Sequence, residues 1–150
     1  MKTIQGIEGF KAMAGQELGE SDWHQVTQDQ IDKFADATGD HQWIHVDQER
    51  AKAGPFGTTI AHGFLTLSLL PSLTGQVTRA EGIRMAINYG LNRVRFPAPV
   101  RSGDSVHARI VISGAETTGD AVQVATSVTI EVEGQAKPAC VAEMLSRYYP

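Results

Sequence analysis

The sequence of 150 residues contains only one cysteine, Cys140. A lone cysteine excludes an intrachain disulfide and cannot by itself form a thiolate metal site. Proteins of oxidising compartments often carry paired cysteines, whereas cytosolic proteins rarely use disulfides. The composition therefore indicates a protein of the reducing cytoplasm.

The sequence also lacks a long apolar run at its N-terminus, where Lys2, Glu8 and Lys11 interrupt short apolar steps. This pattern is typical of neither a signal peptide nor a membrane span. Basic residues are scattered, and the formal net charge is -4. A nucleic-acid duplex or an anionic membrane surface would require a basic stripe, so neither is an expected partner.

No internal repeat, low-complexity tract or linker divides the chain, which predicts a single domain over residues 1–150. Hydrophobic residues make up 41% and charged residues 20%, the balance of an ordinary globular protein.

Two helices are predicted. The first covers Gln28 to Ala37, because Thr27 is a suitable N-cap, the apolar residues recur at helical spacing and Gly39 is a natural stop. The second covers Ile60 to Val77 and is apolar nearly all round, so we expect it to be buried, with a kink at Pro71. Between them, residues 40–59 are expected to be irregular apart from one short helical turn near 47–53, which suggests a functional segment.

After residue 77 the apolar period changes to two, which predicts strands over 85–96, 105–113, 121–133 and 139–148. Short turn segments separate them, so consecutive strands are expected to be antiparallel neighbours in a meander. The predicted fold class is α+β, a single domain whose antiparallel sheet wraps around a long central helix.

Asp40 and His45 are the candidate acid/base pair. A carboxylate and an imidazole five residues apart in irregular chain can converge on one water molecule, and histidine titrates near neutral pH. Gly63 lies in the first turn of the buried helix, where backbone donors lack internal partners, so its N–H can polarise a substrate carbonyl.

Three blocks of residues resemble one family. They are Phe34-Ala35-x-x-Thr38-Gly39-Asp40 through His45-x-Asp47, then Phe56-Gly57-x-x-Ile60-Ala61-His62-Gly63, then Val94-Arg95-Phe96-x-x-Pro99-Val100-x-x-Gly103-Asp104. In order and spacing they resemble the MaoC-like (R)-specific enoyl-CoA hydratases. The segment Asp40-His41-Gln42-Trp43-Ile44-His45 is similar to the corresponding sequence in a mycobacterial subgroup of this family and in its nodulation-protein-N-like members.

The resemblance implies a hotdog fold, a homodimer and reversible hydration of a trans-2-enoyl-CoA to the (R)-3-hydroxyacyl-CoA. It implies no cofactor beyond the coenzyme A of the substrate, and catalysis by Asp40 and His45. Gly63, Ser68 and His62 are the expected substrate-binding residues at the central helix. Arg95 is a further candidate, for the phosphates of coenzyme A, and a place on the solvated face of its strand is the simpler explanation. A non-catalytic acyl-thioester binding protein and a thioesterase are the alternatives; the second is disfavoured because residues 60–77 contain no carboxylate.

Simpler explanations stand beside these roles. Asp40 can be a turn residue, His62 a helix-start residue and Ser68 a hydroxyl bonded to its own helix. No metal is expected at the acidic residues and histidines of this region, which are His41, His45, Asp40, Asp47 and His62. One departure concerns Gln42-Trp43, where the commonest family pattern has Asn-Pro; it can alter the loop or shorten the pocket.

Overall fold

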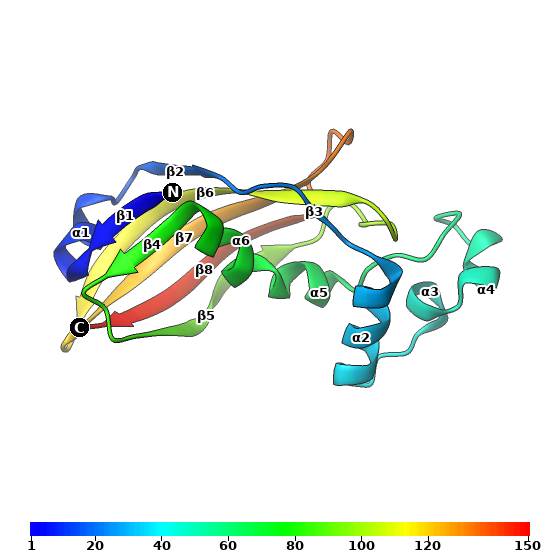
Figure 1. The fold of residues 1–150 in the computed structure, drawn as a ribbon, viewed down its shortest axis with the longest axis horizontal. Helices are drawn as coiled ribbons and strands as arrows, with labels where there is room; N and C mark the ends of the chain where they lie inside the picture. The colour runs from blue at the N-terminus through cyan, green and yellow to red at the C-terminus, as the bar shows by residue number, and fades with distance from the viewer.

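The computed structural model describes all residues from 1 to 150 and is built around one antiparallel sheet (Figure 1). The strand order is β2-β6-β7-β8-β5, and β3 also pairs with β6. The bounds are β2 (Glu17–Glu20), β3 (His24–Gln25), β5 (Met85–Arg95), β6 (Ser105–Thr118), β7 (Ala121–Val132) and β8 (Cys140–Tyr149). This confirms the predicted α+β class.

The central helix is divided into α5 (Gly63–Ser68) and α6 (Leu70–Val77), which run along one face of the sheet (Figure 1). Their leucines pack in one core with the inward side chains of the sheet, among them Ile110, Val124 and Ile130. The expected interruption near Pro71 is confirmed, since Pro71 lies in the first turn of α6. The predicted start at Ile60 is wrong by three residues, because Ile60 forms a β-bridge with Arg101.

The predicted order of the four strands needs one correction. β6, β7 and β8 form the expected meander, but β5 pairs with β8 and not with β6. The reason is the joining segment 96–104, which is engaged elsewhere: Val100 accepts a hydrogen bond from Ala61 N–H (2.8 Å), and Ser102 N–H donates to Thr59 (2.9 Å). The segment 96–104 between β5 and β6 therefore crosses the end of the sheet, and these two strands are not neighbours.

β6 is longer than predicted. Its pairing with β7 continues past a register shift between Ile112 and Gly114 and ends where Thr118 faces Ala121. Gly114 therefore marks a bulge within the strand, although the sequence suggested a turn there. The tight turn is made by Gly119-Asp120 alone.

The N-terminal elements were not predicted, because they are too short to show a period. They are β1 (Lys2–Gln5) and α1 (Gly6–Ala12), together with β2 and β3. β1 pairs in parallel with β4 (Thr78–Glu81), which follows α6. Phe10 of α1 enters the core and stacks on Tyr148 of β8, with ring centroids 4.1 Å apart.

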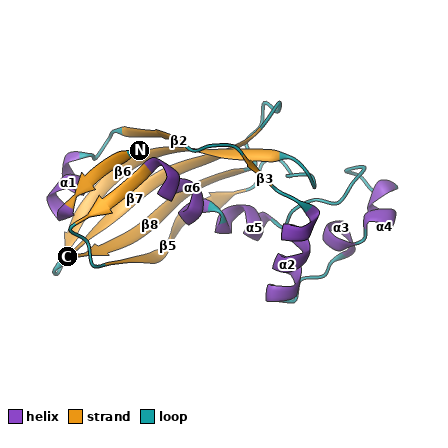
Figure 2. Ribbon diagram, in the orientation of Figure 1, coloured by secondary structure: helices purple, strands orange, loops and turns teal.

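Three short helices extend beyond the other end of the sheet, away from both termini (Figure 2). They are α2 (Gln28–Thr38), α3 (Trp43–Val46) and α4 (Gln48–Lys52). Thr27 caps α2 by accepting from Gln30 N–H, and Gly39 ends it with a φ of 82°, as the sequence predicts. Asp47 caps α4, whereas α3 lies where irregular chain was expected. None of the helices is long and apolar enough to cross a membrane.

Candidate active site

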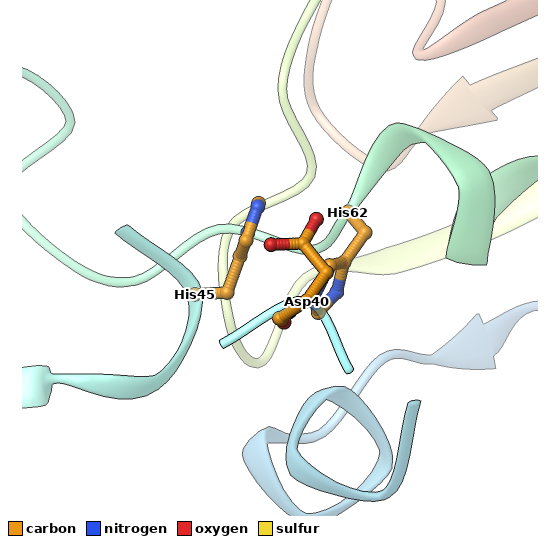
Figure 3. Close-up of side chains that lie close together, drawn as sticks. All are labelled: Asp40, His45 and His62. Carbon is orange, nitrogen blue, oxygen red and sulfur yellow. The ribbon is translucent and has the colours of Figure 1, made fainter. Parts of the chain in front are cut away.

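Asp40, His45 and His62 come together where the α2–α4 region meets the start of α5 (Figure 3). Asp40 follows the C-cap of α2, His45 belongs to α3, and His62 is the N-cap of α5. One side-chain oxygen or nitrogen atom of each lies within 4.8 Å of the others. The structure therefore brings together two residues predicted to act on water and a third predicted to bind substrate.

The ring of His45 is buried, with 6% of its surface exposed. Its Nδ1 lies 2.7 Å from the carbonyl oxygen of Ile60. A carbonyl oxygen only accepts, so Nδ1 carries the proton and Nε2 of the neutral ring keeps a lone pair. Burial lowers the pKa of His45 below its ordinary 6.5 and outweighs the opposing effects of the Ile60 carbonyl and Asp40. At neutral pH the ring is a neutral proton acceptor.

The ring of His62 lies against that of His45, with centroids 3.8 Å apart and planes 22° from parallel. Its Nε2 is 2.9 Å from the backbone oxygen of Asp40, and its Nδ1 is buried without a hydrogen-bond partner. As expected, His62 starts the helix and bonds to backbone, but the partner is 22 residues away in sequence.

The carboxylate of Asp40 is exposed and accepts a hydrogen bond from Gln42 N–H at 3.3 Å. This is the Asx-type turn that the sequence allowed as the simpler explanation. The turn does not exclude the other role, because it uses only one carboxylate oxygen and leaves the second free. The local turn thus also fixes the direction of the carboxylate.

Buried polar contacts brace the segment that carries His45. Gln28, the first residue of α2, donates from Nε2 to the backbone oxygen of His45 at 2.8 Å. The hydroxyl of Thr59 donates to Oε1 of the same Gln28. Ile60 N–H donates to Ile44 at 3.0 Å, so Ile60 is bonded to α3 through both its N–H and its carbonyl. Sequence reasoning missed these three residues, because only the folded chain brings them to His45.

Trp43 packs away from the histidines. The guanidinium of Arg50 lies 4.3 Å from the centre of the Trp43 ring, and Gly54 is so close that an added Cβ would be 3.2 Å from that ring. The indole therefore joins α3 to α4.

Gly63 lines a cavity of about 300 Å³ whose other walls are largely apolar. An added Cβ at Gly63 would lie 2.9 Å from the ring of Phe96, closer than real Cβ atoms approach. Glycine is therefore required for the packing of Phe96 against the start of α5.

Ser68 and Arg95 lie farther away. The hydroxyl of Ser68 donates to Phe64 one turn earlier (2.6 Å), and Ser68 lines a second cavity of about 390 Å³ between the central helix and strands β5 and β8. Arg95 is exposed and donates to the neighbouring backbone oxygen of Val94 at 2.7 Å. Neither touches the Asp40, His45 and His62 cluster.

The cluster has the residue types of a metal site but not the geometry of one. A metal ion lies in the plane of each imidazole that binds it, about 2.0–2.1 Å from nitrogen for zinc. The rings of His45 and His62 stack face to face, so their in-plane lone pairs do not converge on one point. The absence of a metal at this cluster stays a prediction.

Comparison with known proteins places the chain in a family. Residues 9–134 match the family model described as "MaoC like domain". The chain is 58% identical over 149 residues to 3-hydroxyacyl-thioester dehydratase Z of Mycobacterium tuberculosis, covering 99% of both chains. It is 49% identical over 135 residues to nodulation protein N of Rhizobium leguminosarum, covering 88% of this chain and 84% of that protein.

Among solved structures, the (R)-hydratase from A. caviae involved in PHA biosynthesis superposes with a TM-score of 0.73 at 24% identity. The match covers 91% of this chain and 96% of that chain. At this identity the likeness concerns the fold, which is the predicted hotdog fold. The resemblance inferred from the three sequence blocks is confirmed: the chain belongs to the family of MaoC-like domains.

Proposed function

We propose that the protein catalyses the reversible hydration of a trans-2-enoyl thioester to the (R)-3-hydroxyacyl thioester, with Asp40 and His45 as catalytic residues. The observation that carries the proposal is the unprotonated Nε2 of a buried, neutral His45 beside the carboxylate of Asp40. The family membership and the dehydratase relative support the same class of reaction.

The arrangement suits one water molecule held between the two groups. His45 takes a proton from water through Nε2 while the oxygen bonds to C3 of the enoyl group, and Nε2–H then returns this proton to C2, so that one water is added across the double bond and His45 is neutral again. Asp40 orients the water through its free carboxylate oxygen. The lowered pKa of His45 keeps the acceptor unprotonated at neutral pH, and the reverse sequence dehydrates the product.

Negative charge develops on the thioester oxygen when water adds. Gly63 is the first residue of α5, where an N–H has no intrahelical partner, and it lines the 300 Å³ cavity, so we assign its N–H to that oxygen. Ser68 is assigned to the wall of the acyl pocket, because it lines the 390 Å³ cavity. Arg95, exposed on β5, is assigned to the phosphates of the coenzyme A carrier. No cofactor is required by this scheme.

A homodimer is part of the proposal. β5 pairs only with β8 and leaves its other edge free. Met85, Ile87, Tyr89 and Leu91 on this strand are 43, 43, 54 and 43% exposed. A free edge strand with exposed apolar side chains is an aggregation hazard unless it is covered. A second copy of β5, antiparallel about a two-fold axis, would cover both edges.

Loss of the enoyl-thioester absorbance on addition of protein to crotonyl-CoA or a medium-chain enoyl-CoA tests the function. We expect turnover, and a loss of about 10²–10⁴-fold in kcat for Asp40→Asn and for His45→Gln. His41→Gln is the matched control, because His41 is exposed and bonds to Asp36 on α2. Folded Asp40→Asn and His45→Gln proteins that both retain wild-type turnover would exclude the mechanism. Tight binding without turnover by the wild type would instead favour an acyl-thioester binding protein.

A further inference from the structure

His62 is one of the most enclosed polar side chains of the protein. It is 3% exposed, and rings lie on it from two elements: His45 of α3, stacked at 3.8 Å, and Phe34 of α2, tilted at 4.8 Å. A residue that touches the substrate needs an accessible atom. The burial of His62 therefore points away from the direct substrate contact that the sequence suggested.

The single hydrogen bond of the His62 ring defines its tautomer. Nε2 lies 2.9 Å from the carbonyl oxygen of Asp40, which only accepts, so the proton is on Nε2. Nδ1 then holds a lone pair in a buried position without a donor. The two stacked rings have opposite tautomers, because His45 carries its proton on Nδ1.

The bond from His62 fixes a second part of Asp40, its backbone carbonyl. Gln42 N–H holds the carboxylate, and His62 holds the backbone carbonyl of the same residue. Gly39 immediately before Asp40 has a positive φ, so the chain changes direction there. A carboxylate at such a bend needs support from both sides if its distance to the His45 ring is to be constant.

We infer that His62 is a positioning residue: it fixes Asp40 through the Nε2–H donor and supports the ring of His45, and it does not touch the substrate. The inference rests on the proposed function, because it assigns His62 to the same acid/base pair. The His62 side chain has two properties that matter here, its Nε2–H donor and its imidazole ring. The donor orients Asp40, and the ring supports His45.

Two substitutions separate these properties. His62→Phe keeps a ring against His45 and removes the donor, whereas His62→Gln loses the ring and places an amide N–H at nearly the reach of Nε2. We expect His62→Phe to lower kcat by about 10- to 100-fold with KM changed less than about threefold, because a small displacement of a catalytic group costs rate more than binding. His62→Gln should recover most of the lost kcat. A folded His62→Phe with wild-type kcat, or equal losses in both variants, would overturn the inference.

A second measurement does not depend on turnover. Correlation of ring nitrogens with ring protons by NMR distinguishes the two histidine tautomers. We expect the Nε2–H form for His62 and the Nδ1–H form for His45, and a shift of the Gln42 amide signal in His62→Phe but not in His62→Gln. An Nδ1–H form for His62 would refute the contact itself. Absence of enoyl-thioester turnover in the wild type, with these tautomers observed, would count against the proposed function and leave the positioning contact intact.

Discussion

Gln28 connects the folding of α2 to the position of His45, and its replacement by leucine should weaken both. The substitution removes the donor to the His45 carbonyl and leaves the hydroxyl of Thr59, a residue only 1% exposed, without its acceptor. Leaving buried polar groups unpaired costs about 1–3 kcal/mol. With about 2 kcal/mol lost, the melting temperature of a 150-residue domain should fall by about 4–8 °C.

Urea unfolding at constant protein concentration measures the effect, and a double-mutant cycle with Thr59→Val isolates the pair. The double variant replaces both partners by apolar groups, so we expect it to be about 1 kcal/mol more stable than the sum of the single losses predicts. Gln5→Leu is the control, since exposed Gln5 bonds only to exposed Glu81, and should cost no more than about 0.5 kcal/mol. A loss for Gln28→Leu no larger than the control, or a strictly additive cycle, would refute the reasoning.

Three further outcomes are expected. Because the pKa of His45 is lowered in the folded protein, the unfolded chain binds a proton more readily, and the contribution of His45 to stability should be lost as pH falls below about 6.5. The pH dependence of the free energy of unfolding should therefore differ between wild type and His45→Gln in this range. Parallel pH dependences would contradict the assignment. If the proposed dimer forms, Ile87→Lys on the free edge of β5 should convert it to monomers in analytical ultracentrifugation, whereas Lys137→Glu, in the loop before β8, should not. A dimer unchanged by Ile87→Lys would place the interface elsewhere. Burial raises the pKa of Cys140 to about 11, so the native thiol should resist labelling at pH 8 and react after unfolding; rapid native labelling would show that β8 opens.

The sequence predicted those parts of the fold that depend on local chemistry. Thr27 and Gly39 mark the ends of α2 because capping depends on side chains within a few residues. The strands after residue 77 follow from a period of two, which a buried face imposes. Asp40 and His45 were singled out because they stand in one short irregular segment. The structure brings their side chains together, while their catalytic role stays a prediction.

What the sequence did not predict depends on distant contacts. β5 lies beside β8 because segment 96–104 bonds to residues 59–61, a choice that strand composition does not encode. The support of His45 by Gln28, and of Asp40 by His62, spans 17 and 22 residues. No periodicity or motif relates these positions, so only the folded chain shows them.

The separation of the 390 Å³ cavity from the histidine cluster has an evolutionary consequence. The 390 Å³ cavity is lined by α5, α6, β5 and β8, and it includes none of Asp40, His45 and His62. Substitutions at Leu67, Leu91 or Met144 can therefore change the size of this space while the proton-handling residues remain in place. Under the proposed assignment of this cavity to the acyl chain, the length of chain that is accepted can change in a lineage while Asp40 and His45 stay the same.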